Sequence, residues 1–523
     1  MNAKLKLIHV LFLLFIIFLF PVISSEANNQ GNNSANNVLM SQTQLIKMVC
    51  ENNFDIMYQH YDLELAIEQI NKEQAIFEPK LIASYTHQDS LSPNTAEEYY
   101  DRQWQDKFQE RISSYQLGIS GLFPTGTLYS FNFSIDEVDN DLIDTRYPDN
   151  TESEASSNIG IQLTHPFLKN GGNKITEAKI QIAKFARDIS YQAYRQKVID
   201  IVYSALNAYW ELYYTSQQYD IYKDSVQIAT DLLQTYREMV EVGKVAETEL
   251  FEIKSGLALR QSLLSAAHEK LKTAQNNILQ LLGKSRNTDK ETYYTPTDKP
   301  VFYEICDSIN PVEVLDQAIM YNPRYLSGLE NIKKQNIHID YAKNQCLPEL
   351  NFKATAGVKS LDKHPEMFFK NLWNDNDESW SIGVEFKLPL TGNLDSNSEL
   401  RMSKIKKRQA SLSFQAIKVD LENEVDNSIQ RINSAKIQVD RHQENVTLKQ
   451  KIMNIEMNKL EGGKSNIMEV LEKEKGLNQA KNGLLKSIVN MELSGIALRK
   501  IDGTLIERYG VEIEKENTKI DSL

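Results

Sequence analysis

Apolar and polar positions follow two different rhythms along this chain. In residues 129–135 and 382–388, apolar side chains alternate with polar or small ones. Residues 81–85, 117–119 and 159–163 repeat this period of two over shorter runs. Alternation of this kind predicts β-strands that have one apolar face and one hydrated face.

The second rhythm is helical and extends over unusually long segments. Residues 173–242 contain neither Pro nor Gly, and at a rise of 1.5 Å per residue such a helix would be about 100 Å long. Residues 393–460 predict a second helix of similar length. Between residues 250 and 281, apolar side chains recur in a heptad rhythm that is broken only at Arg260. A narrow apolar stripe on a polar helix favours coiled-coil packing over burial in a globular core.

The same construction occurs twice in the same order. Each copy has a strand that ends in Pro, a long helix, a Gly-Lys turn, a return helix and a closing Gly. The corresponding positions, first copy before second, are Gly160 and Gly383, Pro166 and Pro389, Gly243 and Gly463, Glu249 and Glu469, and Gly283 and Gly503. This shared order and spacing predict a duplicated half-molecule.

The two copies define the predicted domain boundaries. The N-terminus is predicted to be a secretory signal peptide, because Lys4 and Lys6 precede an apolar run and small residues follow it. An uncleaved anchor is the alternative. The predicted order is a signal peptide (1–25), a first structural repeat (26–283), an inter-repeat equatorial segment (284–310), a second structural repeat (311–503) and a C-terminal tail (504–523).

An exported chain with these strands is either a soluble sandwich or a protein that crosses a membrane with its strands. The connections between the strands bear on this choice. Residues 88–111, 136–157 and 359–379 are long, polar and rich in carboxylates, whereas residues 123–127 form a short turn. Long loops on one side and tight turns on the other are typical of outer-membrane barrels.

Composition and motifs argue against catalysis and nucleic-acid binding. The chain has 523 residues and a net charge of −13, and its eight histidines and three cysteines form no zinc-binding pair. Residues 463–465 match the Gly-Lys-Ser end of the phosphate-binding loop motif, but Asn458 occupies the position of the first glycine that this motif requires. An acidic chain without a basic patch is unsuited to nucleic acid. We therefore predict no enzyme activity, no cofactor and no bound metal.

These features together resemble the TolC-like outer membrane efflux protein family, over nearly the whole mature chain. The motifs are paired: helices that reach a Pro and enter a strand (61–85 and 323–354), strand-to-helix passages (166–172 and 389–393), and helical turns at Gly243 and Gly463. The resemblance implies an α+β membrane protein built from two internal repeats. In it, a trimeric outer-membrane β-barrel is continued by a long periplasmic α-helical barrel.

The resemblance also implies a function. Such a protein is a passive exit duct for efflux or type I secretion. It is embedded in outer-membrane lipid and works with a periplasmic adaptor and an energised inner-membrane transporter. The alternative from another class is an exported coiled-coil scaffold without channel activity, which explains the helices but not the duplicated strands.

The resemblance places candidate functional residues beside the helical turns. Within residues 463–472, Glu469 and Glu472 correspond to the carboxylates that form a constricting ring at the periplasmic entrance, and Glu249 and Glu252 hold the corresponding positions in the first copy. Three copies would bring these like charges close to one axis, where their repulsion and bound cations tune opening. The alternative is a set of solvated glutamates on helix surfaces.

The turns themselves, at Gly243, Lys244, Gly463 and Lys464, resemble the sites where adaptor hairpins dock. The alternative is that each turn is only a helix end capped by Gly. The chain departs from the family pattern in using Glu where aspartates are familiar, and in having Ser465 where some members carry a basic residue.

A second departure lies in residues 116–135, which supply two more strands than the simplest family plan. Either each protomer contributes about six strands rather than four to a wider barrel, or this pair folds outside the membrane.

Overall fold

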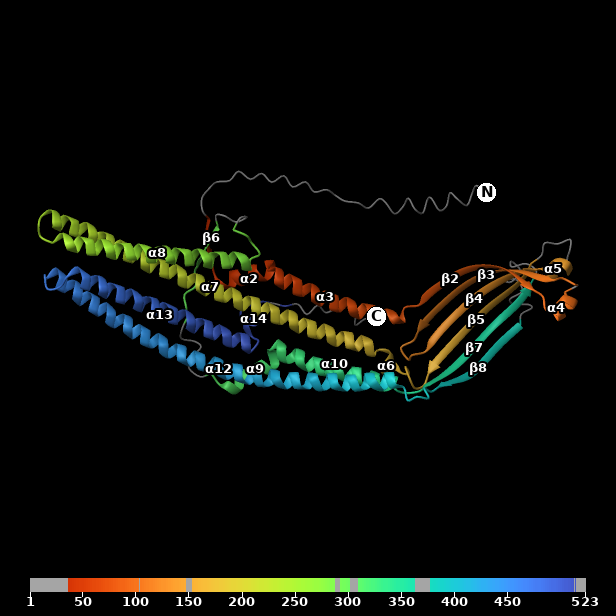
Figure 1. The fold of residues 1–523 in the computed structure, drawn as a ribbon. Coiled ribbons are helices and arrows are strands. Elements are labelled where there is room, and N and C mark those ends of the chain that lie inside the picture. Colours follow the sequence, from red (N-terminus) through yellow and green to blue (C-terminus); the bar gives the residue numbers. More distant parts are fainter. Residues whose placement is uncertain are drawn as a thin grey trace, which may run out of the picture.

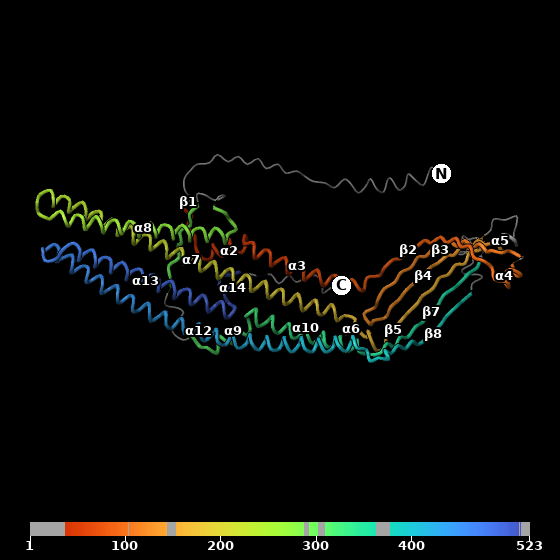
Figure 2. Tube along the Cα trace, viewed as in Figure 1, coloured from red at the N-terminus to blue at the C-terminus, as the bar shows by residue number. Residues whose placement is uncertain are grey.

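The computed structural model describes residues 36–102, 104–146, 153–286, 292–301, 309–362, 377–511 and 513. The predicted signal peptide (1–25) lies outside these described residues, as do parts of the other segments predicted to be loops, connections or tail. The molecule is long and narrow. A sheet occupies one end, and two helical hairpins reach the other end side by side (Figure 1, Figure 2).

The first half of the chain passes from two helices into four long strands and then into a hairpin of long helices. Its elements are β1 (Asn36–Met40), α2 (Gln42–Asn52), α3 (Phe54–Gln74), η1 (Ala75–Phe77), β2 (Lys80–Pro93), α4 (Ala96–Asp101), β3 (Lys107–Leu122), β4 (Leu128–Asn140), α5 (Asp141–Arg146), β5 (Glu154–Pro166), α6 (Asn173–Thr176), α7 (Ala178–Glu241) and α8 (Glu247–Leu281). The long helix predicted over residues 173–242 is confirmed as α6 and α7.

The second half repeats this plan with two strands instead of four. After β6 (Thr292–Pro296) come α9 (Pro311–Tyr321), α10 (Pro323–Gln345), β7 (Glu349–Asp362), β8 (Asp377–Lys387), α12 (Leu394–Glu461), α13 (Ile467–Ile501) and α14 (Leu505–Arg508). The helix predicted over residues 393–460 is confirmed as α12.

Six strands form one antiparallel sheet in the order β2-β3-β4-β5-β7-β8. The chain enters it through α3 and α10, which end shortly before Pro79 and Pro348, because a Pro ends a helix and suits the start of a strand. Every strand predicted from alternation lies in this sheet. Within the described residues β2 and β8 each pair with one neighbour, so they are the sheet edges.

The strands are longer than predicted at the end away from the helices. Residues 88–93 belong to β2 and residues 107–111 to β3, although both stretches were expected in a loop. The same correction applies to other ends of predicted loops, namely residues 136–140 of β4, 154–157 of β5, 359–362 of β7 and 377–379 of β8. In these stretches apolar residues such as Leu91, Phe108 and Val138 are isolated among polar ones, so alternation gives no signal there, whereas backbone pairing continues.

The helices beside the sheet form one layer. Helix α3 packs along α7, α7 packs along α10, and α10 packs along α12. Beyond this layer α8 returns along α7, α13 returns along α12, and α13 also contacts α7 (Figure 1). Every helix in the described part of the chain is too short or too polar to span a lipid bilayer.

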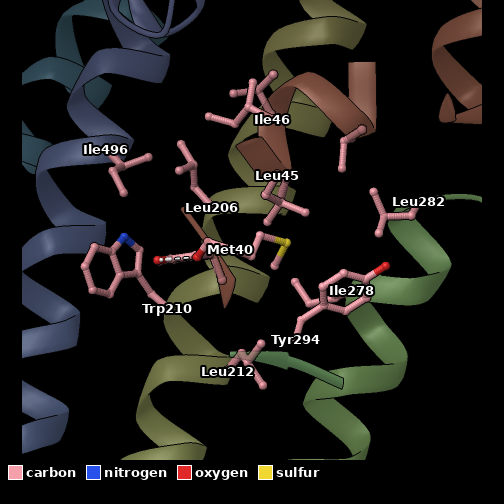
Figure 3. Close-up of a cluster of buried hydrophobic side chains, with 14 of the residues drawn as sticks. Met40, Leu45, Ile46, Leu206, Trp210, Leu212, Ile278, Leu282, Tyr294 and Ile496 are labelled. Atoms are coloured by element: carbon pink, nitrogen blue, oxygen red, sulfur yellow. Dashed lines mark hydrogen bonds between the residues drawn. The ribbon is translucent and has the colours of Figure 1, made fainter. Parts of the chain in front are cut away.

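The largest core lies at the middle of the molecule, where β1 and β6 form a small parallel sheet that the sequence patterns did not predict. Tyr209 and Trp210 of α7 are fully buried there, and Ile496 of α13 lies beside the Trp210 indole (Figure 3). The Tyr209 hydroxyl donates to the Met40 carbonyl at 3.2 Å and accepts from the Thr297 amide at 3.1 Å. This core therefore fixes α7 to both strands.

Candidate functional site

The two helical hairpins end in turns of the same geometry. Gly243 and Gly463 adopt φ values of +72° and +66°, which favour glycine. The Lys244 amide donates to the Met239 carbonyl at 2.9 Å, and the Lys464 amide donates to the Lys459 carbonyl at 2.8 Å. Each turn therefore closes its long helix with a Schellman motif. All four residues predicted at the turns are exposed at the same end of the molecule.

The second turn has side-chain bonds that the first turn does not match. Asn466 caps α13 by accepting from the Glu469 amide at 2.9 Å, whereas Ala246 occupies the corresponding position before α8. Ser465 donates to the Glu456 carboxylate at 2.5 Å, and Lys459 donates to it at 3.1 Å. The hydrogen bond from Ser465, and after it the bond from Lys459, holds the pKa of Glu456 below its usual value.

The predicted gate glutamates lie on the first turns of the two return helices. Glu469 and Glu472 share an exposed side of α13, and each lies beside a lysine of its own helix: Lys473 is 3.2 Å from Glu469, and Lys475 is 3.5 Å from Glu472. Their carboxylates are therefore partly compensated in one protomer. In the first copy Glu252 is exposed and Glu249 is half-buried on α8.

A small apolar core lies directly behind these glutamates. It contains Tyr236 of α7, Ile253 of α8, and Ile467, Val470 and Leu471 of α13. Because both hairpins contribute to it, the core fixes one tip relative to the other. The structure thus brings the two predicted glutamate pairs, one from each hairpin, to the same end of the molecule. Both pairs lie beside this shared apolar core.

Comparison with known proteins identifies the family of this chain. The family model described as outer membrane efflux protein matches residues 45–284 and 314–504. The chain belongs to the outer membrane efflux protein family. It is accordingly an exit duct for efflux that resides in the outer membrane, with its long helical part in the periplasm.

Solved outer-membrane channels share the fold of this efflux family member at low sequence identity. The CmeC channel of Campylobacter jejuni is 16% identical with a TM-score of 0.64, and the match covers 89% of this chain and 86% of CmeC. VceC of Vibrio cholerae is 13% identical with a TM-score of 0.61, covering 88% and 96%. MtrE of Neisseria gonorrhoeae, in its open state, is 12% identical with a TM-score of 0.60, covering 88% of each chain. No curated protein matches the sequence.

The sequence patterns missed one polar cluster in this efflux family member. Arg260 of α8 is buried and donates to the buried Glu474 of α13, with Nε and Oε2 separated by 3.1 Å. Ser225 of α7 also donates to Glu474, at 2.6 Å. The signal was present as Arg260 interrupting the heptad rhythm, but the partner became evident only once α8 and α13 were placed together.

Proposed function

We propose that this chain forms a passive homotrimeric duct in which strands from three copies close a β-barrel in outer-membrane lipid and their helices continue it as an α-helical barrel in the periplasm. The observation that carries the proposal is that each protomer ends in two complementary edges that no other described segment of the chain covers. One edge consists of β2 and α3, and the other consists of β8 and α12.

The strand edges support ring closure. β2 and β8 each present one row of backbone donors and acceptors without a pairing strand among the described residues. In lipid such groups must be paired, because hydrocarbon offers no hydrogen bonds. Pairing β2 of one copy with β8 of the next satisfies both edges at once and leaves no free edge when the ring closes.

The helix edges have matching apolar stripes. On α3, Phe54, Tyr58, Tyr61 and Leu65 are 62–69% exposed at helical spacing. On α12, the exposed stripe contains Met402, Ile405, Leu412 and Val419. Stripes of this kind pack as coiled coils. Since α3 runs towards the sheet and α12 runs away from it, neighbouring copies would pack these helices in antiparallel fashion.

Charge complements these stripes. The exposed side of α3 carries Glu64 and Glu68, whereas the corresponding side of α12 carries Arg401, Lys404 and Arg408. Both groups lie at a similar distance from the sheet along their helices. Opposite charges beside an apolar seam fix the register and partner of packed helices. Contact between α3 of one copy and α12 of the next is therefore more favourable than contact between two α3 helices or two α12 helices.

Nearer the tips a second pair of stripes extends the same contact. On α8, Phe251, Leu259 and Leu263 are exposed, and on the far part of α12, Leu448, Ile452 and Ile455 are exposed. Helices α8 and α12 are the outer members of the two hairpins. Packing α8 of one copy on α12 of the next would close the helical part of the ring.

Internal duplication accounts for the two halves. Asn53 caps α3 and donates to the last carbonyl of α8, at Leu281, over 3.0 Å. Asn322 caps α10 and donates to the last carbonyl of α13, at Ile501, over 2.9 Å. Helices α8 and α13 each have 35 residues. This shared pattern supports repeats at residues 26–283 and 311–503, joined by residues 284–310 and preceded and followed by the segments 1–25 and 504–523.

The tips supply the entrance of the proposed duct. In a trimer, Glu469, Glu472, Glu249 and Glu252 would each occur three times around one axis, which concentrates negative charge at a narrow opening. The exposed turns at Gly243, Lys244, Gly463 and Lys464 would receive a periplasmic adaptor. Because the proposed duct is passive and carries out no enzymatic step, an inner-membrane transporter would drive export.

Mass and conductance test the proposal together. The purified mature chain in mild detergent should have the mass of a trimer, and in planar bilayers it should give discrete conductance steps. A monodisperse protein without bilayer activity would contradict the duct and favour the exported coiled-coil scaffold.

A further inference from the structure

The hairpin of β3 and β4 occupies the interior of the sheet. It lies between β2 and β5, and both of its strands are hydrogen-bonded along their length to those neighbours. If this hairpin folded away from the sheet, a gap would be left between β2 and β5, and the sheet would be interrupted. Its strands have 16 and 13 residues, more than the roughly 9–11 residues that a tilted strand needs to cross a bilayer.

One face of the sheet is mainly apolar across its six strands, including the hairpin, with Glu378 of β8 as a charged exception in the rows below. A row of paired residues runs through Leu81, Ile119, Phe131, Ile161, Ala356 and Trp380. The next row runs through Ala83, Leu117, Phe133, Ile159, Val358 and Glu378. Leu117 is 47% exposed and Phe131 is 43% exposed, so no other described part of the protomer covers the apolar side chains of the hairpin, as is true of Leu81 on β2 and Trp380 on β8. An exposed apolar band of this extent suits contact with lipid.

The opposite face carries small and mostly uncharged side chains. One row runs through Ser84, Gln116, Ser134, Asn158, Lys359 and Asp377. Another runs through Ile82, Gly118, Asn132, Gly160, Gly357 and Ser379. Serines, glycines and amides leave space inside a barrel and hydrogen-bond to water. The hairpin contributes to this hydrated face in the same rows as the other strands.

The turn that joins β3 and β4, at residues 123–127, packs onto the junction between the sheet and the helices. The Thr125 carbonyl accepts from the Gly172 amide at 3.0 Å, and Thr127 is hydrogen-bonded to His165 at 2.7 Å. Gly126 has φ +89°, and a Cβ there would lie 2.5 Å from the Asn170 carbonyl oxygen. Only glycine fits this close approach. The turn is therefore a fixed part of the rim where β5 passes into α6.

We propose that the β3–β4 hairpin is part of the membrane wall, and that three copies enclose an eighteen-stranded, water-filled section that passes bulky hydrophilic cargo. This inference rests on the trimer of the proposed function, since three sheets of six strands give eighteen. Barrels of about 16–18 strands leave an aqueous channel, and barrel diameter grows roughly in proportion to strand number. Without the hairpin, three copies would supply twelve strands and a diameter smaller by about one third.

Cysteine labelling in bilayers tests where the hairpin lies. In a chain whose Cys50, Cys306 and Cys346 are replaced by Ser, single cysteines are placed at neighbouring positions of each strand. Gln116→Cys and Ser134→Cys should react with a charged, membrane-impermeant methanethiosulfonate and lower the conductance. Leu117→Cys and Phe133→Cys, on the lipid face of the same strands, should do neither.

Matched positions on β5 separate this inference from the proposed function. Asn158→Cys and Ile159→Cys lie in the same two rows outside the hairpin. If Asn158→Cys blocks current while all four hairpin cysteines label from water without effect, the hairpin lies outside the wall and the inference is wrong. If no variant, including the parent, conducts, the duct itself is wrong and the inference falls with it.

Polymer exclusion tests the width. In a variant lacking residues 95–152, β2 is followed by β5, which has the orientation of the removed β3 and can replace it. The largest polyethylene glycol that can enter the channel from its β-barrel end should have a radius about one third smaller for this variant than for the full chain. An unchanged cut-off would overturn the wide section. If the variant does not assemble, the labelling pattern in the full chain decides the question.

Discussion

Arg260 of α8 and Glu474 of α13 form a buried ion pair that joins the two helical hairpins. Arg260 also donates to the carbonyls of Gly256 at 3.0 Å and Leu471 at 3.3 Å, and Glu474 accepts from Ser225 at 2.6 Å. Gly256 leaves room for the guanidinium, because a Cβ there would lie 3.2 Å from Arg260 Nη1. Three helices therefore share one satisfied polar cluster within an otherwise apolar seam.

Removing one member of this pair should destabilise the protein strongly. Arg260→Met leaves the Glu474 carboxylate buried without its cation, at a cost of about 3–5 kcal/mol. The double variant Arg260→Met with Glu474→Leu removes both charges and should recover most of that loss. Thermal unfolding followed by helical circular dichroism measures both, and Lys270→Met, an exposed change on α8, serves as the control. Equal destabilisation by the single and double variants would contradict the assignment.

The same pair shows what sequence alone can and cannot provide. Arg260 was visible as a break in a heptad rhythm, because such a pattern depends only on neighbouring residues. Its partner was not, because Glu474 lies on a helix of the other half and is brought near by tertiary packing. The Gly-Lys turns were predictable for the opposite reason: positive φ is a local property of Gly243 and Gly463.

Some strand boundaries were likewise predictable from local sequence, whereas others were not. Alternation in residues 129–135 found β4 because one side of that strand is apolar. The extensions of β2 and β3 away from the helices were missed because their few apolar residues, Leu91 and Phe108, are isolated among polar ones. β1 and β6 were also missed, since they are five residues each and owe their pairing to the core around Tyr209. Such segments form strands through tertiary contacts that leave little periodic trace.

Charge at the two protomer edges should control assembly. Glu64→Lys together with Glu68→Lys would place two cations of α3 opposite Arg401 and Lys404 of the next copy. Like charges beside the seam repel, so the trimer should dissociate in detergent at low salt. Adding Arg401→Glu and Lys404→Glu restores opposite charges and should restore the trimer. Light scattering of the detergent complex reports the mass.

A matched charge change away from the edges controls for net charge. Glu97→Lys with Asp101→Lys alters the same number of carboxylates on the exposed helix α4. This variant should remain trimeric. If it dissociates as well, or if the four-residue swap does not reassemble, the α3–α12 contact is wrong.

Replacing each of the two adjacent glycines at the second turn by alanine should change the stability of the turn to different extents. A Cβ on Gly463 would meet no atom of the described residues within 4 Å, so its cost arises from the backbone at φ +66°. Gly463→Ala should therefore destabilise the turn by about 1–2 kcal/mol. Gly462→Ala should be neutral or slightly stabilising, because Gly462 has φ −80° and ψ 5°. Hydrogen exchange of the Lys464 amide measures both, and equal protection in the two variants would argue against the Schellman turn.

The same turn should loosen in acid. The pKa of Glu456 is lowered in the folded protein, chiefly by the hydrogen bond from Ser465, so folding favours its ionised form. The contribution is present above the unfolded pKa of about 4.3 and is lost as the pH falls through the lower folded value. Exchange protection at the tip, corrected for intrinsic rates, should fall in that acidic range. Ser465→Ala should weaken this pH step, and an unchanged step would show that Glu456 is not its source.

The charge of the entrance glutamates should control both conductance and block by divalent cations. Glu469→Gln with Glu472→Gln removes two charges per copy near the proposed axis, so the conductance should change and block by divalent cations should weaken. Lys473 lies 3.2 Å from Glu469, so Lys473→Gln should have the opposite effect and strengthen divalent block. Glu249→Gln with Glu252→Gln makes the matched change on α8 and shows whether the first copy also lines the opening. Single-channel recording across a calcium series measures all three. If conductance and divalent block are unaltered in the Glu469 and Glu472 variant, these glutamates lie on a solvated helix face and the constriction is formed elsewhere.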